Sequence, residues 1–531
     1  MHLSRAIAAA LAAFSAFAIP GGSPAVAQTL NLAVGAPVTS LDPHYHALSP
    51  NYAVADMLFD SLTTFDAKAR LQPRLAESWR PISESVWEFK LRPNVTFHDG
   101  TPFTAEDVAF TIERVPTVPN SPSSYGIYTR AVKRVEIVDP LTVRLHTDGP
   151  YPLLATDLAQ VQMLSAKIHR GAATEDFNSG KVAIGTGPFR MISHRNGDRI
   201  EYARNDSYFG DRPAWERVNY RMITNDAGRT AALLAGDVDF IDQVPTSDIA
   251  KLRRENRVTL SEADGLRLIF LALDHSRDGA TPFVTDNDGK PIARNPLRDL
   301  RVRQALNLAV DRPAIAERVM EGAASPTAQF LSIGSYSSLP DMPALRPDAN
   351  RAKALLAEAG FPNGFRITLH GPNDRYMNDA RIIQAIGQMW TRAGVRTQVE
   401  GQPWAAYVAR AGRQEFSAFL LGWGISSGEA TSPLRALIAT YSTERGWGGS
   451  NRGRYANPAV DAKLGEALRT LDDAQRERIL QEASRLALED VAIIPIHIQK
   501  NIWAMRRGLA HEARADELTR AQDVRPAAAG G

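Results

Sequence analysis

No cysteine occurs anywhere in the 531 residues of the chain. This absence excludes disulfide bonds, metal sites built on thiolates and the attachment of a lipid to a cysteine. After residue 27 there is also no apolar run long enough to cross a bilayer. Basic and acidic residues are nearly balanced, with 61 Lys and Arg against 59 Asp and Glu, so we expect neither nucleic acid nor an anionic membrane as a partner.

The first 27 residues are typical of a secretory signal peptide. Arg5 supplies a positive charge, and Ala6–Ile19 follows as an apolar run too short to span a membrane. Pro20 ends this run, and residues 25–27 satisfy the small-x-small cleavage rule. We therefore predict cleavage after Ala27, export to the periplasm without a lipid anchor, and no membrane insertion of the mature chain.

Residues 71–114 show a clear order of local structure. Apolar and charged side chains alternate over 87–92, which is the period-two pattern of a half-buried strand. Residues 95–98 suit a second strand, followed by an Asp-Gly pair that suits a tight turn. Thr104 is then placed to cap a helix, with Asp107 reaching back as in a capping box.

This stretch, above all FHDGTPFTAEDV at 97–108, resembles the signature of the extracytoplasmic solute-binding proteins, family 5, which serve ABC transporters for dipeptides, oligopeptides and nickel chelates. Further matches lie at 184–189 (IGTGPF), 205–209, 236–241, 295–312 and 454–464. The resemblance therefore covers nearly the whole chain after residue 27. It implies an α/β fold of the two-lobed periplasmic-binding-protein type (type II, Venus flytrap) with an extra third subdomain.

The chain is longer than one hydrophobic core usually covers, so several domains are expected. By the resemblance, lobe I (domain Ia) comprises residues 28–59, 184–274 and 496–525, the extra subdomain (domain Ib) residues 60–183, and lobe II residues 275–495. The chain then crosses between the lobes near 270–280 and again near 490–500. Two crossing segments form a hinge, and the cleft between the lobes is the expected ligand site.

The spacing of apolar residues predicts the strands and helices of the two lobes. Strands are expected at 29–34, 238–241, 265–274, 365–370 and 396–400, with a strand-rich segment at 491–504. Helices are expected at 227–234, 297–310, 312–320, 350–359, 379–393 and 472–488. Residues 365–400 therefore form a strand–helix–strand unit, which makes lobe II an α/β domain.

Two tryptophans mark the expected ligand site. Trp404 and Trp423 lie nineteen residues apart, a spacing that resembles two pocket tryptophans of oligopeptide binders. Large rings with few torsions suit a pocket that accepts varied side chains. In peptide binders of the family an aspartate follows the second tryptophan by three positions and pairs with the α-ammonium group of the ligand. Here that position holds Ser426, and we expect Glu429 to be the carboxylate able to replace the missing counter-charge.

Other residues are expected to complete the cleft. By the resemblance, Tyr125 and Tyr128 occupy a loop where the family often places an aromatic ring against the ligand. Tyr407, Arg410 and Ser427 flank the tryptophan segment and are candidates for the opposite wall.

Two alternative functions remain open. Gly424–Gly428 satisfies the GxSxG pattern of the nucleophile elbow of serine hydrolases, and Asp461 and His497 follow in the required order. Against a hydrolase, no oxyanion motif precedes the pattern, and residues 429–433 have the composition of a loop. The second alternative is a metal-chelate binder of the same family, although no histidine lies between His370 and His497 to serve as a ligand.

The preferred interpretation is the periplasmic solute-binding component of an ABC importer. It captures a small organic solute, a peptide or peptide-like compound, and delivers it to the membrane permease in a closed form that the ligand favours. We expect a monomer with no catalytic residue, no metal and no cofactor. His44 and His46 are interpreted as part of a polar loop, because no neighbouring residue completes a metal site.

Overall fold

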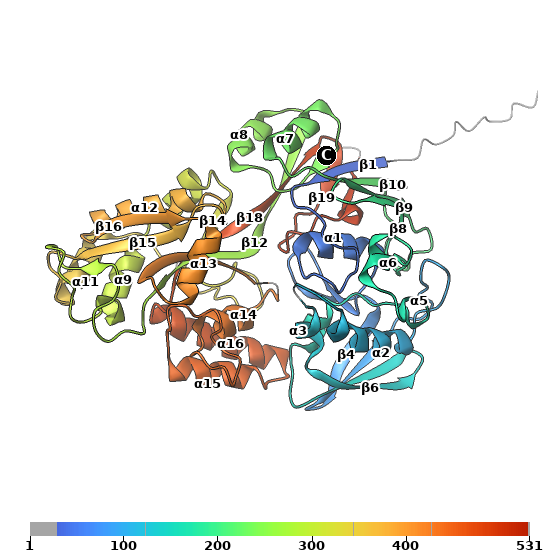
Figure 1. The fold of residues 1–531 in the computed structure, drawn as a ribbon, viewed down its shortest axis with the longest axis horizontal. Helices are drawn as coiled ribbons and strands as arrows, with labels where there is room; N and C mark the ends of the chain where they lie inside the picture. Colours follow the sequence, from blue (N-terminus) through green and yellow to red (C-terminus); the bar gives the residue numbers. More distant parts are fainter. Residues whose placement is uncertain (1–28, 123, 343–344, 426, 529–531) are drawn as a thin grey trace, which may run out of the picture.

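The computed structural model describes residues 29–122, 124–342, 345–425 and 427–528. These residues form two lobes side by side, joined by a pair of long strands (Figure 1). The chain begins in one lobe, called lobe I here, builds the other, called lobe II, and returns to lobe I near its C-terminus. The predicted two-lobed α/β fold is therefore confirmed. The predicted signal peptide lies outside the described residues.

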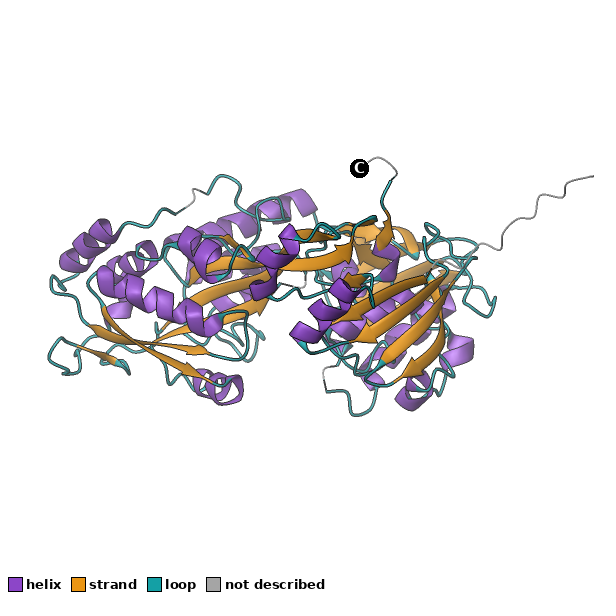
Figure 2. Ribbon diagram, turned by 90° about the horizontal axis from the view of Figure 1, so that it is seen from above, coloured by secondary structure: helices purple, strands orange, loops and turns teal. Residues whose placement is uncertain are grey.

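Among the described residues, a single mixed sheet of twelve strands runs through both lobes, as seen from above in Figure 2. Its strands follow the order β13-β15-β17-β12-β18-β11-β1-β10-β9-β8, with β14 on β18 and β16 on β15. Lobe I contributes β1 (Thr29–Val34), β8 (Phe189–Arg195), β9 (Arg199–Arg204), β10 (Arg217–Met222) and β11 (Phe240–Ile241). Lobe II contributes β13 (Val284–Thr285), β14 (Ala324–Pro326), β15 (Arg366–Pro372), β16 (Arg396–Gln402) and β17 (Ala418–Gly424).

The two strands that join the lobes are β12 (Val258–Leu273) and β18 (Ile494–Arg506), which pair with each other in antiparallel fashion. From Arg267 onward, β12 also pairs with β17 of lobe II, and the register shifts between Asp264 and Arg267 as at a β-bulge. A Cβ at Gly265, inside this bulge, would stand 2.6 Å from the carbonyl oxygen of Gln499. A second register shift lies between Ile269 and Phe270, at the start of the crossing expected at 270–280. We take the first shift as the hinge, because β17 joins β12 directly after it and a bulge interrupts the ladder.

Helices pack against the lobe I part of the sheet. They are α1 (Ser49–Leu58), α7 (Asp226–Ala235) and α8 (Thr246–Arg254), and the C-terminal segment adds β19 (Leu509–His511), the 3₁₀ turn η5 (Ala521–Asp523) and β20 (Val524–Pro526). The predicted end of α7 is confirmed, because Gly236 caps it with a left-handed φ of 87° that glycine adopts without strain.

Lobe II is an α/β domain, as predicted. Its helices are α9 (Leu300–Leu308), α10 (Arg312–Ala314), α11 (Ala349–Glu358), α12 (Asp379–Arg392), α13 (Trp404–Gly412), α14 (Thr431–Pro433), α15 (Pro458–Ala467) and α16 (Asp473–Glu489). Shorter turns are η2 (Pro296–Arg298), η3 (Ile315–Val319) and η4 (Leu434–Ile438). The strand–helix–strand unit is confirmed as β15, α12 and β16, with the strands parallel. The helix expected at 312–320 continues from α10 as a π turn, η3.

A separate antiparallel sheet, in the order β4-β5-β7-β6, lies within the predicted subdomain 60–183. Its strands are β4 (Ala76–Ser83), β5 (Val86–Leu91), β6 (Val132–Asp139) and β7 (Thr142–Thr147). Around it lie β2 (Thr63–Phe65), β3 (Leu71–Pro73), α2 (Ala105–Arg114), η1 (Val115–Thr117), α3 (Gly126–Thr129), α4 (Leu154–Leu158), α5 (Ala166–His169) and α6 (Thr174–Asn178).

The predicted N-terminus of α2 is confirmed, because the Asp107 carboxylate accepts a hydrogen bond from the backbone N–H of Thr104 at 2.8 Å. The strand expected at 95–98 is wrong. Only one isolated bridge, between Thr96 and Pro102, forms there. A longer ladder is prevented because Pro102 has no N–H to donate.

The two glycines of the IGTGPF segment pack against the C-terminal end of α1. A Cβ at Gly185 would stand 2.0 Å from the Leu58 carbonyl oxygen, and a Cβ at Gly187 would stand 2.5 Å from the Leu58 carbonyl carbon. The N–H of Gly187 donates to that same oxygen at 3.0 Å. The segment therefore marks a close approach of two backbones, which only glycine permits.

We expect Gly187→Ala to lower the free energy of unfolding by about 3 kcal/mol, because backbone atoms of α1 cannot move aside as a flexible side chain can. Urea denaturation of the mature chain measures the change. Gly149→Ala is the matched control, since no atom lies within 4 Å of a Cβ built there. Equal stability of the two variants would contradict the steric explanation.

Candidate functional site between the lobes

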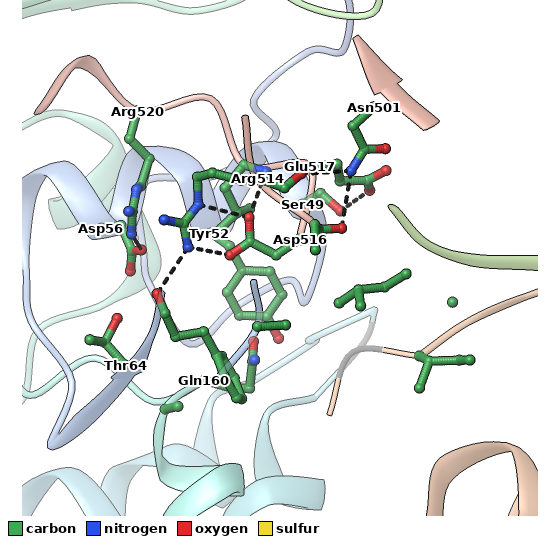
Figure 3. Close-up of a pocket in the computed structure, with 18 of the residues that line it drawn as sticks. Ser49, Tyr52, Asp56, Thr64, Gln160, Asn501, Arg514, Asp516, Glu517 and Arg520 are labelled. Atoms are coloured by element: carbon green, nitrogen blue, oxygen red, sulfur yellow. Dashed lines mark hydrogen bonds and ion pairs between the residues drawn. The ribbon is translucent and has the colours of Figure 1, made fainter. Parts of the chain in front are cut away.

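A cavity of about 170 Å³ lies beside the hinge and is called the hinge cavity here (Figure 3). Lobe I lines it with one face of α1, including Tyr52, and with the loop Arg514–Leu518. Arg267 of β12 and the segment Gly424–Ile425 after β17 line it from lobe II. A cavity walled by both lobes at their hinge is where ligand binding and lobe closure are coupled most directly.

The loop Arg514–Leu518 is tied to both strands of the hinge. The Ala515 carbonyl oxygen accepts the N–H of Leu266 in β12 at 3.1 Å and the side-chain amide of Asn501 in β18 at 3.0 Å. The N–H of Ala515 donates to the Ala67 carbonyl oxygen at 2.8 Å. The loop therefore fixes its own side chains relative to both β12 and β18.

Ion pairs stiffen the lobe I wall of the hinge cavity. Arg514 contacts Asp516 at 2.5 Å, and Arg520 contacts Asp56 at 2.8 Å (Figure 3). Arg520 also contacts Asp523 at 2.8 Å. Burial acts to lower the pKa of Arg520, but the carboxylates of Asp523 and Asp56 hold that pKa well above its ordinary value. These arginines are thus neutralised within the wall itself.

A second cavity of about 480 Å³, called the outer cavity here, adjoins the hinge cavity, since Phe65 and Ala69 line both. It lies between the 60–183 subdomain and lobe II. Three of its lining residues carry buried polar atoms with no hydrogen-bond partner in the described part of the chain: Trp87 Nε1, Ser427 Oγ and Arg476 Nε. Buried polar groups are rarely left unpaired, so these atoms favour a ligand or water in the outer cavity.

The segment after the second tryptophan does reach the cleft. Ile425 lines the hinge cavity and Ser427 the outer cavity, while Ser426 between them lies outside the described residues. Glu429 also lines the outer cavity, but its carboxylate is buried and contacts Arg476 at 2.8 Å. The carboxylate expected to replace the missing aspartate is therefore already paired with a cation of its own lobe.

Neither tryptophan lines the hinge cavity or the outer cavity. Trp423 is half-buried on β17, and its indole N–H donates to Ser432 Oγ at 3.0 Å. Trp404 begins α13, with its ring edge-on to Tyr376 at 5.8 Å and under the guanidinium group of Arg375 at 5.4 Å. Both rings are partly exposed, so their contact with ligand stays a prediction.

Two further candidates, Tyr407 and Arg410, lie away from both cavities. Tyr407 is fully buried, and its hydroxyl donates to the Leu420 carbonyl oxygen at 2.6 Å, so it belongs to the lobe II core. Arg410 pairs with Glu415 at 2.9 Å. Neither residue lines the hinge cavity or the outer cavity.

The two loop tyrosines stand behind a third tyrosine that the sequence did not single out. Tyr125 is 1% exposed and packs edge-on against Tyr52 at 5.3 Å, and the Tyr52 hydroxyl donates to Tyr128 at 3.2 Å. Because Tyr52 itself lines the hinge cavity, Tyr125 and Tyr128 support the wall in this conformation rather than forming its surface.

In the described residues, the side chains expected for a hydrolase site or a metal site do not contact one another. Both ring nitrogens of His497 are buried without a hydrogen-bond partner, and Asp461 instead accepts the N–H of Thr440 at 3.0 Å. His44 is buried against Arg114 and the Gln162 carbonyl oxygen, whereas His46 contacts Thr39 Oγ1. Within the described ranges, no three His, Cys, Asp or Glu side chains are placed to hold a metal ion.

The residues that wall the hinge cavity from the lobe I side carry almost no signal in the sequence. Tyr52, Asp56 and Gln162 come from a helix and a loop with no distinctive motif, and Arg514–Arg520 has the composition of an ordinary charged surface segment. Only its charge density was available as a signal, and charged runs are usually solvated.

The family is decided by comparison with known proteins. A model of the bacterial extracellular solute-binding proteins, family 5, matches residues 70–444. The chain belongs to this family. Family 5 proteins serve ABC importers as extracytoplasmic binding components, and this chain is accordingly a solute-binding protein. None of the helices in its described residues is both long and apolar enough to cross a membrane.

Several family 5 relatives match over most of their length. The glutathione-binding protein GsiB of Escherichia coli K12 is 27% identical over 519 residues, which cover 95% of this chain and 94% of that protein. Heme-binding protein A of Haemophilus influenzae is 30% identical over 480 residues, covering 84% of this chain and 82% of that protein. Both are named as binding proteins.

Solved structures show the same fold. HbpA2 from Haemophilus parasuis superimposes with a TM-score of 0.82 at 24% identity, covering 94% of this chain and all of that one. The unliganded open form of MppA, a periplasmic murein tripeptide binding protein, has a TM-score of 0.80 at 21% identity, covering 94% of this chain and 97% of that one.

Proposed function

We propose that this family 5 protein captures a small peptide-like solute in the hinge cavity and the adjoining outer cavity, and presents it to the permease of an ABC importer. The observation that carries the proposal is a cavity lined by both lobes at the bulge of β12. A ligand held there contacts lobe I and lobe II at once, so it binds the closed form more tightly and shifts the population toward it.

The similarities support a solute of this size and polarity. The relatives named above bind glutathione and heme, and a structural neighbour from Helicobacter pylori holds the peptide STSA. Unpaired donors in the outer cavity, such as Trp87 Nε1 and Arg476 Nε, suit the carbonyl and carboxylate oxygens of such compounds. Binding and release need no catalytic residue, and we propose that the chain is not an enzyme.

The site of action follows from the N-terminal segment. We propose that the signal peptide is removed after Ala27 and that the mature chain works in the periplasm as a monomer. Mass spectrometry of the exported protein tests the cleavage site, and light scattering tests the monomer.

Ligand binding is expected to raise the stability of the mature chain. At about a hundredfold excess over the dissociation constant, a ligand that binds only the native state adds about 2.7 kcal/mol to the free energy of unfolding. Thermal shifts should be measured with glutathione, di- to pentapeptides, heme and nickel with histidine. Saturable stabilisation by glutathione or a peptide supports the proposal. Stabilisation by nickel and histidine together, with no effect of peptides, would instead favour the metal-chelate alternative.

A further inference from the structure

The charges around the hinge cavity do not cancel within the protein. Its ionic lining consists of Arg267, Arg514, Arg520, Asp56, Asp516 and Glu517. Two arginines and two aspartates of this set are paired with each other in the lobe I wall. Glu517 and Arg267 remain, and among the described residues neither has an oppositely charged side chain within 4.0 Å. One unpaired anion from lobe I and one unpaired cation from lobe II therefore share a single cavity.

Glu517 is held in place by its surroundings. Ser49 at the start of α1 donates a hydrogen bond from Oγ to the Glu517 carboxylate at 2.6 Å (Figure 3). The backbone of Glu517 has a φ of 61°, a left-handed conformation that is unfavourable for a residue with a side chain. Such a conformation persists only where neighbouring contacts impose it, and here the anchored Ala515 carbonyl lies two residues away. Glu517 is an exposed residue that also lines the hinge cavity, and the hydrogen bond from Ser49 orients its carboxylate without any cation.

Gln162 adds a second acceptor to the same cavity. Its side chain is buried, with the residue only 1% exposed, and its amide nitrogen donates to Asp56 Oδ1 at 2.9 Å. The amide orientation is therefore settled, and the oxygen Oε1 is left with no donor in the described part of the chain. A buried acceptor without a partner is unfavourable, and a ligand N–H would remove that cost. A carboxylate and an amide oxygen together suit an ammonium group, which has three donors and no acceptor.

Arg267 supplies the complementary group from the other lobe. It is the first residue of β12 that pairs with β17, directly after the bulge. Its guanidinium group presents a planar set of donors that matches a carboxylate. Because no carboxylate of the described chain contacts it, this binding capacity is open to a ligand.

We propose that the hinge cavity binds a small zwitterion, with its ammonium group at Glu517 of lobe I and Gln162 of the 60–183 subdomain and its carboxylate at Arg267 on the lobe II side of the bulge. This inference rests on the proposed function and names the ligand class of the same site. It moves the expected ammonium contact away from positions 426 and 429. The reason is that Glu429 is already paired with Arg476, whereas Glu517 has no cation. The ligand then bridges the lobes by its two charges, which favours closure.

Isothermal titration of the mature chain tests this assignment with four probes: trialanine, N-acetyl-trialanine, trialanine amide and reduced glutathione. The wild type should bind trialanine at least tenfold more tightly than its acetylated form. Glu517→Gln should weaken trialanine binding by about 10- to 100-fold and abolish that preference, since glutamine keeps an acceptor oxygen but loses the negative charge that attracts the ammonium group. Arg267→Gln should weaken trialanine binding but leave binding of trialanine amide unchanged. Glutathione, which also carries a free ammonium group, should follow trialanine in each variant.

Glu512→Gln is the matched control. It removes a carboxylate from the same C-terminal segment at an exposed position that does not line the hinge cavity, so binding should equal that of the wild type. Ligand-free melting curves of all variants report on folding, and glutamine at 517 can still accept from Ser49.

The other outcomes are decisive as well. If Glu517→Gln keeps the preference for the free amine, or the wild type has none, the ammonium site is overturned while the proposed function stands. If Glu517→Gln and Arg267→Gln weaken the binding of every probe equally, the two residues pair with each other on closure and do not contact the charged groups of the ligand, which overturns the inference. If no probe binds the wild type, both the inference and the peptide-like solute are overturned.

Discussion

Replacing Arg476 by methionine should lower the free energy of unfolding by about 3–5 kcal/mol. The side chains of Arg476 and Glu429 are 5% and 4% exposed, and their charged groups lie 2.8 Å apart. Burial acts to lower the pKa of Arg476, but the Glu429 carboxylate holds it above its ordinary value. Removing the arginine leaves Glu429 as a buried carboxylate without a counter-charge, which is the reason for the large loss.

Two further variants distinguish loss of the Glu429–Arg476 ion pair from a destabilisation that any substitution would cause. Arg476→Met combined with Glu429→Met should recover most of the stability, because two apolar side chains replace a desolvated ion pair. Arg485→Met lies on the same helix, but its partner Asp341 is 69% exposed, so we expect a loss of no more than about 1 kcal/mol. Urea denaturation of the wild type, Arg476→Met, Glu429→Met and the double variant gives the coupling energy, and Arg485→Met serves as the control. A coupling energy near zero would show that Glu429 is free after all and would restore it as a ligand residue.

Acidification should destabilise the protein strongly between pH 6.5 and pH 4. Burial lowers the pKa of seven histidines: to about 3 for His44 and His497, to about 4 for His98, His275, His370 and His511, and in the same direction for His169. For His497 burial is the sole cause. These groups stay neutral in the folded chain but take up protons in the unfolded chain below pH 6.5. Their contribution to stability is complete above that pH and is lost as the pH falls toward the folded-state pKa values.

Two buried aspartates act in the opposite direction. Burial raises the pKa of Asp157 to about 7 and that of Asp242 to about 6. Each therefore binds a proton in the folded chain at a pH where the unfolded chain does not, and this partly offsets the histidines. Near pH 5, the six histidines with values given above take up protons on unfolding, whereas Asp157 and Asp242 release them, so roughly four net protons are bound. The free energy of unfolding should therefore fall by on the order of 5 kcal/mol for each pH unit of acidification.

Denaturant midpoints measured from pH 7.5 to pH 4.5 test this expectation. His497→Leu should reduce the slope by about one proton, because His497 makes no hydrogen bond that the substitution would break. A stability that is flat over this range would mean that the histidines are accessible to protons in the folded chain. The prediction applies to the ligand-free protein.

Much of the local structure was predictable from the sequence. The alternation at 87–92 became β5, the Thr104–Asp107 capping box formed, and the unit at 365–400 became β15, α12 and β16. Such features depend on side-chain period and on hydrogen bonds between near neighbours, which a chain carries without reference to its fold. The family resemblance likewise depended on ordered motifs in the sequence and was confirmed over residues 70–444.

The candidate site was only partly predictable, because its chemistry depends on pairing between distant residues. The sequence placed Glu429 near the cleft but did not show that Arg476, 47 residues later, neutralises it. Tyr407 has the composition of a pocket residue, yet packing around α13 buries it completely. Local pattern alone does not separate a paired carboxylate from a free one.

The two-lobed family fold and its main strands and helices could be predicted from the sequence alone. Long-range contacts place Glu517 and Arg267, 250 residues apart along the chain, at one cavity, and put a bulge beside Gly265 of β12. The physical reason is that a side chain becomes a binding group only when its neighbours in space leave its charge unpaired. Those neighbours are chosen by long-range sheet pairing and loop anchoring rather than by adjacency along the chain.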